Sequence, residues 1–445
     1  MSATRTPTAT SPTRLADLAA AAKSDRNRAV DFFRAVAMIA VAIGHWMAIA
    51  VSADAEGNVS AGNALVDAPN MAWFSWALQV MPLFFVVGGF SSAMSLDAHT
   101  NRHGRPQDWV AARLRRMLAP TVVLAGFWLG ALTIGTALGF GSYAAQGAVA
   151  AAIPLWFLAN YTIDTAIAPV VLPAFRHNPR LVAGGGVALF CALEALRLVG
   201  VPVIPHLNWV LGWLLFQVAG FAWRDGLLPT GRRLVALAAG AWAAALTVVL
   251  AGPYPVSMVN VEGLEHSPAN PPTLALLLFG TAHAATALCF APMINRWLAD
   301  NAKAWAAVVA ANTVAMSVYL WHMTAAVVAG VALLALDLLP TAAVGASAWW
   351  LQKLPLIAAA AVVLAGLVAA VARFEQGALL AERQPWRGGV VSMTAVAALT
   401  SAALKLWVAG SPVAVAVACA GVVALWFGAI HRPAGRTTVS ASLEG

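Results

Sequence analysis

The chain contains a succession of apolar runs, each long enough to cross a lipid bilayer. A helix needs about 20 apolar residues to span the hydrocarbon core, and about twelve such runs follow one another along the 445 residues. Only 10% of the residues are charged and the mean hydropathy is +0.78, whereas soluble domains are about 25% charged. The sequence therefore excludes a soluble globular protein. It predicts an all-α fold, a polytopic bundle of transmembrane helices.

The predicted spans are rich in Ala, Leu and Val and lack the alternating ten-residue segments of an outer-membrane strand, which favours helices. They lie at residues 31–51, 72–96, 117–139, 148–173, 181–199, 207–223, 232–251, 273–292, 307–336, 346–372, 389–408 and 412–430.

The positions of the basic residues predict the orientation of the bundle. Loops that stay on the cytoplasmic side carry the excess of Lys and Arg. The 26 Lys and Arg residues lie before the first span or in alternate connections after it, apart from four within spans: Arg34, Arg197, Lys353 and Lys405. This pattern predicts that both termini are cytoplasmic and that the protein is a multi-pass protein of the cell (plasma or inner) membrane. The net charge of +8 therefore does not indicate nucleic acid.

Composition also suggests a division into domains. Residues 1–27 are rich in Ser, Thr, Ala and Pro and predict a disordered cytoplasmic arm. Residues 28–372 form a predicted ten-span core. Residues 373–430 hold a polar linker and two further spans, interpreted as an appendage to that core, and residues 431–445 are a predicted cytoplasmic tail.

The first span carries ionisable residues that hydrocarbon disfavours by several kcal/mol. At 100° per residue, His45 lies about 20° from Arg34 around the helix and about 16 Å further along it. Asp31 lies about 40° from the direction of His45 on the same reckoning. One helix face thus carries an acid and a guanidinium at one end and an imidazole deep in the membrane. Between them, small residues leave space for an elongated molecule: Ala35, Ala42 and Gly44.

Two interpretations of this face stay open from spacing alone. In the first, Asp31 and Arg34 form an interfacial ion pair and His45 is a histidine satisfied within the bundle. In the second, Arg34 holds an anionic ligand that enters from the cytoplasm. His45 then transfers a proton deeper in the membrane, for which the near-neutral pKa of an imidazole is suited.

Three motifs in this order resemble acyltransferase family 3, the integral-membrane enzymes that O-acylate extracytoplasmic glycans and related acceptors. The first is Asp31-x-x-Arg34 followed, after ten residues, by His45. The second is the double Phe and Gly-Gly-Phe of residues 82–90, and the third is Arg113-x-x-Arg116. Weaker similarities are the Leu-Trp-Phe-Leu of residues 155–158 and the Tyr-Leu-Trp-His of residues 319–322. The resemblance extends over about residues 28–372.

The resemblance implies an acyl-CoA-dependent transferase, with acetyl-CoA as the expected donor. It implies that Arg34, Arg113 and Arg116 hold the donor phosphates, because planar guanidinium groups suit phosphate oxygens. His45 would be the general base or a transient acyl carrier, and Asp31 and His322 are further catalytic candidates. The acceptor would be a glycan, glycolipid or related molecule, as in O-acetylation of a polysaccharide. Gly88 stands where the family usually has Ser, so a role of that hydroxyl is not carried over.

Other polar residues allow two interpretations each. His322 and Tyr319, one turn apart, either orient a substrate or satisfy groups inside the bundle. Asn160 and Asp164 share a helix face and either contact the acceptor or stabilise the bundle. Arg113 and Arg116, if they hold no donor, obey the positive-inside rule beside anionic lipid.

Further expectations concern pairs and lysines elsewhere in the spans. Glu194 and Arg197 are expected to pair at a spacing of three residues, and Lys353 and Lys405 to extend their ammonium groups to the membrane surface. The sequence lacks a metal-ligand spacing such as His-x-x-x-His, so no metal is expected. Membrane lipids are expected partners.

A transporter is the alternative from another functional class. Twelve spans with both ends inside also describe many secondary transporters. The segment Asn101-Arg102-His103-Gly104-Arg105 is similar to a loop motif of the major facilitator superfamily, although Asp97 occupies the position where that motif starts with Gly. A proton-coupled transporter of that type is therefore the alternative to acyl transfer.

Overall fold

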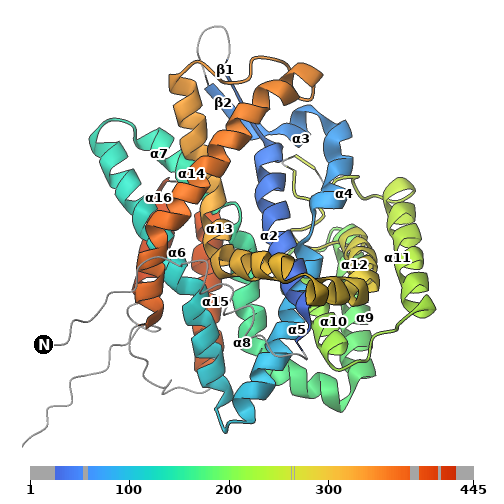
Figure 1. Cartoon of the computed structure of the whole chain (residues 1–445). Coiled ribbons are helices and arrows are strands. Elements are labelled where there is room, and N and C mark those ends of the chain that lie inside the picture. Colours follow the sequence, from blue (N-terminus) through green and yellow to red (C-terminus); the bar gives the residue numbers. More distant parts are fainter. Residues whose placement is uncertain are drawn as a thin grey trace, which may run out of the picture. The chain divides into compact units, whose positions relative to one another are not determined.

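The structure of the protein is a computed structural model, shown in Figure 1. It describes residues 26–53, 59–261, 263–264, 266–380, 390–408 and 412–426. Nearly all of the predicted N-terminal arm, part of the predicted linker and the whole predicted C-terminal tail lie outside the described residues.

Helices account for almost all of the described structure. Within that part of the chain, nine helical stretches are long and apolar enough to cross a membrane. They correspond to all or part of α2 (Arg28–Ala48), α5 (Met81–Thr100), α6 (Pro106–Ala137), α8 (Leu155–His177), α9 (Pro179–Leu198), α11 (Arg232–Leu250), α12 (Leu274–Asp300), α13 (Ala302–Ala335) and α14 (Ser347–Leu380). Further helices are α10 (Asn208–Arg224), α15 (Val390–Val408) and α16 (Pro412–Leu425).

Each predicted span overlaps one of these helices (Figure 1). The prediction of a helical, multi-pass membrane protein is therefore confirmed. The number of spans and the side of the membrane on which the termini lie stay predictions.

The predicted span at 148–173 is wrong as one continuous helix. The structure instead contains a short helix α7 (Gly141–Ala152), a break, and then α8 from Leu155. Pro154 lies in the break and has no N–H to donate to the carbonyl of residue 150. That carbonyl accepts from Ile153 instead, at 3.2 Å.

The predicted span at 72–96 is also interrupted. A 3-10 helix η1 (Pro69–Phe74) and a single turn α4 (Ser75–Leu78) precede α5. The side-chain oxygen of Gln79 accepts from the amide of Met81 at 3.3 Å, and this contact bridges the break. Pro82 then occupies the first turn of α5, where a missing N–H costs no helical hydrogen bond.

The first span ends earlier than predicted, because the chain leaves α2 after Ala48 and forms a hairpin. Strand β1 (Ile49–Ala53) pairs antiparallel with β2 (Val59–Asn63), with Ile49 opposite Asn63. A small helix α3 (Ala64–Asp67) follows. A buried apolar cluster joins this region to the start of α14, and it comprises Ala50, Ala64, Ala68, Met71 and Trp349.

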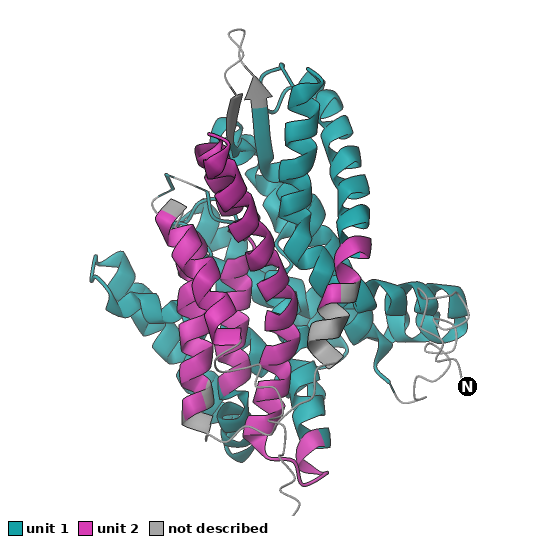
Figure 2. Ribbon diagram, turned by 90° about the vertical axis from the view of Figure 1, so that its left-hand side faces the viewer, with its two compact units in different colours: residues 1–98, 167–368 teal, residues 99–166, 369–445 magenta. Residues whose placement is uncertain are grey.

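Residues divide into two compact units, coloured separately in Figure 2. One unit comprises residues 1–98 and 167–368, and the other comprises residues 99–166 and 369–445. The second unit contains α6, α7, α15 and α16, which pack against one another. The indole of Trp407 on α15 donates to the carbonyl of Ala148 on α7 at 3.0 Å. These units divide the chain differently from the predicted domains, which stay predictions.

In the first unit, α5 and α10 approach each other backbone to backbone. A Cβ atom added at Gly89 would lie 2.0 Å from the carbonyl oxygen of Gln217, and one at Gly220 would lie 2.1 Å from that of Val86. Glycines permit such close helix packing in membranes. The glycine of the Gly-Gly-Phe motif at residue 89 therefore has a structural role.

Candidate active site on the first spanning helix

One face of helix α2 is enclosed by protein. Its main neighbours are α13 and α12. On the open face, Val36, Ile39 and Ile43 are 43%, 52% and 40% exposed. Arg34 and His45 lie on the opposite face, together with Met38 and Val41, which are buried. The two predicted site residues therefore face protein.

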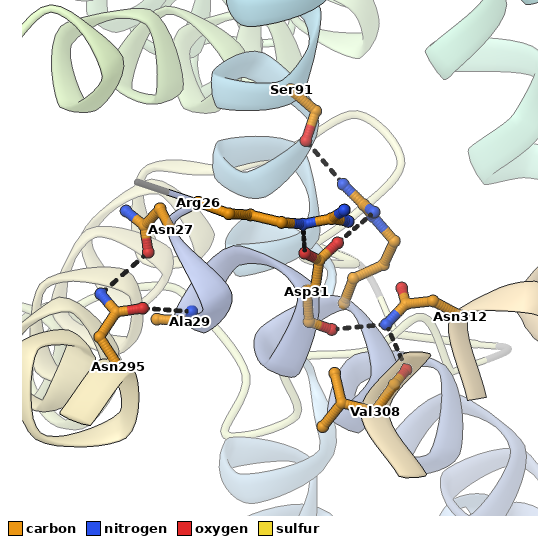
Figure 3. A network of polar contacts seen from close by, with 9 residues as sticks. Arg26, Asn27, Ala29, Asp31, Ser91, Asn295, Val308 and Asn312 are labelled. Atoms are coloured by element: carbon orange, nitrogen blue, oxygen red, sulfur yellow. Dashed lines mark hydrogen bonds and ion pairs between the residues drawn. The ribbon is translucent and has the colours of Figure 1, made fainter. Parts of the chain in front are cut away.

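A network of polar side chains surrounds the N-terminal end of α2 (Figure 3). Nε of Arg26 donates to Oδ2 of Asp31 at 2.8 Å, and Nη1 of Arg34 donates to Oδ1 at 3.3 Å. Nη2 of Arg34 donates to Oγ of Ser91, on α5, at 2.6 Å. The carboxylate side chain is 8% exposed and that of Arg34 is 28% exposed. Asp31 and Ser91 thus fix the direction of a guanidinium that remains partly accessible.

Two asparagines from other helices anchor the same end of α2 (Figure 3). Oδ1 of Asn295, on α12, accepts from the amide of Ala29 at 2.8 Å, which satisfies one of the orphan N–H groups at the helix start. Nδ2 of Asn312, on α13, donates to the carbonyl of Asp31 at 2.8 Å. The position of Arg34 is therefore defined by contacts from α5, α12 and α13.

A pair of histidines lies near the other end of α2. Nδ1 of His45 is 2.9 Å from Nε2 of His322, on α13, and the rings stack with centroids 5.1 Å apart. Nδ1 of His322 is 2.7 Å from the carbonyl oxygen of Tyr319. The indole of Trp46 donates to the carbonyl of His322 at 2.9 Å. His322 is fully buried and His45 is partly exposed.

These contacts assign the proton positions of the histidine pair. A carbonyl oxygen only accepts, so Nδ1 of His322 carries the proton that it donates to Tyr319, and Nε2 carries the lone pair. Nδ1 of His45 must then donate to that lone pair. In neutral His45, Nε2 is left with its own lone pair. This nitrogen is the basic atom of the pair.

Asp31 does not lie with His45. His45 lies fourteen positions further along the unbroken helix, about 21 Å along the axis, and Asp31 contacts Arg26 and Arg34 instead. The structure thus assigns Asp31 to the guanidinium end of the helix.

Part of the space predicted along this face is filled, whereas Gly44 is partly exposed. Ala35 and Ala42 are each 5% exposed, and Met38 and Val41, which lie between Arg34 and His45, are 5% and 7% exposed. The expectation that small residues leave an open path is wrong at these positions, because the small side chains allow close packing of neighbouring helices.

Four other candidate residues belong to the second unit. Arg113 and Arg116 lie on α6, where the guanidinium of Arg113 packs 5.1 Å from the ring centroid of Trp109 and Arg116 is exposed. Asn160 and Asp164 lie on α8 and are fully buried. Their predicted roles in donor and acceptor binding stay predictions.

Elsewhere in the first unit, one expected pair is confirmed and extended. Arg197 donates through Nε and Nη2 to both carboxylate oxygens of Glu194, at 2.8 Å each. The hydroxyl of Tyr254 donates to the same carboxylate at 2.8 Å. Burial and this contact raise the pKa of Tyr254 above its ordinary value. Through Tyr254, the pair on α9 also binds the loop that precedes α12.

The expectation for Lys353 is wrong. Its side chain does not extend to the membrane surface but is 1% exposed, and Nζ donates to the carbonyls of Met47 and Ile49. The sequence also missed Ser91, Asn295 and Asn312 as partners of α2. The one sequence signal for them is that they are polar residues within apolar runs, where a polar side chain needs a hydrogen-bond partner.

The described part of the chain holds no group of three or more His, Cys, Asp or Glu side chains arranged for a metal ion. The expectation that the chemistry needs no metal stays a prediction.

Comparisons with known proteins identify the family. A family model described as an acyltransferase domain, that of acyltransferase family 3, matches residues 27–373. A search of curated proteins found no match, and a search of solved structures found none. No comparison supports the transporter alternative. The match covers α2 and both histidines of the pair. The chain belongs to acyltransferase family 3, a family of membrane acyltransferases.

Proposed function

We propose that the protein is an O-acyltransferase that moves an acyl group, with acetyl the expected one, from cytoplasmic acyl-CoA to a hydroxyl of an extracytoplasmic glycan, glycolipid or related acceptor. The observation that carries the proposal is the histidine pair, in which Nδ1 of His45 lies 2.9 Å from Nε2 of His322, on the same helix face as the guanidinium of Arg34.

In this proposal the N-terminal end of α2 faces the cytoplasm, and both termini of the chain lie on that side. The distribution of Lys and Arg supports this orientation. The phosphates of acyl-CoA bind at Arg34, whose guanidinium is oriented by Asp31 and Ser91 and suits phosphate oxygens. Arg113 and Arg116 of α6 are proposed as further donor contacts.

The proposed reaction uses the lone pair on Nε2 of His45. The acceptor hydroxyl attacks the thioester carbonyl while His45 takes its proton as general base. The tetrahedral intermediate collapses, the C–S bond breaks, and the imidazolium returns the proton to the leaving thiolate. The products are the acyl ester and free CoA. His322 holds the imidazole of His45 in the tautomer that leaves Nε2 free.

The donor path runs past Met38. Packed side chains occupy the interval between Arg34 and His45, so the thioester reaches His45 only if they move. Methionine has three rotatable bonds and adapts its shape readily. We therefore propose that Met38 changes rotamer when the pantetheine arm enters.

The proposal is tested with purified protein in detergent or liposomes, by the transfer of a labelled acetyl group from acetyl-CoA and by the slow hydrolysis of acetyl-CoA. His45→Gln is expected to lower kcat by about 10²-fold or more, the usual contribution of general acid–base catalysis. Arg34→Lys is expected to raise the KM for acetyl-CoA about tenfold, because it removes the planar fork.

Matched controls are a histidine and an arginine on exposed positions. His206→Gln and Arg180→Lys are expected to leave both kinetic constants unchanged. Transfer that is intact in His45→Gln would remove the proposal. Uptake of a solute driven by a proton gradient, without any dependence on acyl-CoA, would favour the transporter instead.

A further inference from the structure

A buried ammonium group closes the end of α2 beyond His45. Lys353 lies on α14, and its Nζ donates to the carbonyl of Met47 at 2.7 Å and to that of Ile49. The same atom lies 4.1 Å from the ring centroid of Trp349 and 5.9 Å from that of Trp350. The side chain is 1% exposed. Within the described residues it makes no ion pair with a carboxylate.

Of the two carbonyls that Lys353 binds, that of Met47 belongs to the last turn of α2, which carries His45, and that of Ile49 belongs to the C-cap residue. The amide of Ile49 donates to the carbonyl of His45 and closes the last turn of α2. The carbonyl of Met47 has no amide further along the helix to pair with, because the chain turns into β1 at residue 49. The carbonyl of Ile49 belongs to the first residue of that strand. A cation at a helix C-terminus also stabilises the negative end of the helix dipole.

Burial of an ammonium group away from water is unfavourable unless its donors are paired. Many helix ends are closed by Gly or by water at smaller cost. Here α14 supplies a cation across more than 300 residues of sequence, and the face of Trp349 provides a cation–π contact for it. Trp349 in turn packs in the apolar cluster beside the β1–β2 hairpin.

We propose that Lys353 is a positioning residue for His45. The clamp from α14 holds the last turn of α2 so that the imidazole of His45 stays in register with His322 on α13. This inference rests on the proposed function, since it assigns Lys353 to the geometry of the same reaction.

Three variants of Lys353 separate positioning from mere packing. Lys353→Met keeps the length of the side chain without donors or charge, Lys353→Gln keeps an amide donor, and Lys353→Arg keeps a cation. Misplacement of a catalytic group by about 1 Å costs about 10²-fold in rate. We expect Lys353→Met to lower kcat for acetyl transfer by that amount while the KM for acetyl-CoA changes less than about twofold. The kcat of Lys353→Gln is expected to lie between those of the wild type and Lys353→Met, and Lys353→Arg is expected to retain most of the wild-type kcat.

The matched control is Lys405→Met, which removes a lysine near the end of a helix in the other unit. It is expected to leave kcat and KM unchanged. A kcat that is unaltered in both Lys353→Met and Lys353→Gln overturns the proposal. The proposal is also overturned if every Lys353 variant, Arg included, shows a lower kcat, a higher KM for acetyl-CoA and less folded protein. Lys353 would then have a packing role.

A second measurement does not depend on activity. Amide hydrogen exchange over His45–Ile49 is expected to rise about tenfold in Lys353→Met, because the last turn of α2 opens more often once its carbonyls lose their donor. Unchanged exchange overturns the clamp even if the wild-type protein transfers no acyl group. If the wild-type protein transfers no acyl group, the proposed function fails, whereas the hydrogen-exchange result still decides whether Lys353 holds the end of α2.

Discussion

Nδ1 of His45 on α2 lies 2.9 Å from Nε2 of His322 on α13, and the carbonyl of Tyr319 occupies the other nitrogen of His322. The two histidines are 277 residues apart in sequence. His322 is fully buried, so in the proposed reaction it acts through His45 and not on an acceptor directly. The contact converts two isolated polar residues in apolar helices into one chemical unit.

Replacing His322 tests that unit. His322→Phe removes the acceptor for the Nδ1 proton of His45 and is expected to lower kcat about 10²-fold, with the KM for acetyl-CoA unchanged. His322→Gln retains an acceptor and is expected to lose less. The measurement is steady-state acetyl transfer by purified protein. Equal rates for the wild type and His322→Phe would show that His45 needs no partner.

Enlarging Met38 tests the proposed donor path. Met38 lies on the face between Arg34 and His45 and is 5% exposed. Met38→Trp is expected to reduce acetyl transfer about tenfold or more, since a rigid ring cannot clear the path as methionine does. Met38→Leu, of similar volume, is expected to stay within about threefold. The measurement is the initial rate of transfer at a fixed acetyl-CoA concentration.

The control for Met38 lies on the opposite face of the same helix. Ile39 is 52% exposed, and Ile39→Trp is expected to leave the rate unchanged. If Ile39→Trp and Met38→Trp slow the reaction alike, the effect belongs to α2 packing in general and the path is elsewhere.

The close approach of α5 and α10 predicts a large cost for a single methyl group. A Cβ at Gly89 would meet the carbonyl of Gln217 at 2.0 Å, so Gly89→Ala must push the two backbones apart. Overpacking of this kind costs about 1–3 kcal/mol, which we expect as a lower free energy of unfolding in an SDS titration. Gly130→Ala is the control, because the added methyl group meets no atom within 4 Å beyond its own stretch of helix backbone. Equal stability of the two variants would contradict the backbone contact.

An arginine clamp predicts how stability depends on pH. Arg176 donates to Asp97 through Nη1 at 2.7 Å and to Asp225 through Nε at 2.7 Å. The hydrogen bond from Arg176 lowers the pKa of Asp225 below its ordinary value of 3.8. A lowered pKa in the folded protein means that the pair stabilises the fold above the unfolded pKa and that this contribution is lost as pH falls through the folded pKa.

We therefore expect the thermal midpoint of the wild type to fall between about pH 5 and pH 3. Asp225→Asn removes the titrating group and is expected to show a lower midpoint at pH 6 with a shallower fall below pH 5. The measurement is thermal unfolding in detergent over this pH range. If the thermal midpoints of the two proteins fall in parallel as the pH is lowered, Asp225 does not contribute to the loss of stability in acid.

Several features of the site followed from local sequence. The 3.6-residue period placed Arg34 and His45 on one face, and the structure shows that this face is the one enclosed by protein. The spacing of Glu194 and Arg197 predicted their contact, which is present. Both conclusions depend only on the geometry of a single helix, and an unbroken helix preserves that geometry.

Other features needed partners from distant segments. Hydropathy within α14 does not indicate that Lys353 turns inward, because the carbonyls that accept from its ammonium group belong to Met47 and Ile49, in a distant segment. The breaks around Pro154 and before Met81 were missed because hydropathy does not register where backbone hydrogen bonds stop.

The sequence by itself determined that this is a helical membrane protein of acyltransferase family 3, because apolar length and short motifs are properties of consecutive residues. Only the tertiary structure decided that His322 contacts His45, that Ser91 orients Arg34, and that Lys353 binds the end of α2. Each of these contacts joins residues from segments that are far apart in the chain. Their meeting depends on how whole helices pack, which no local pattern encodes.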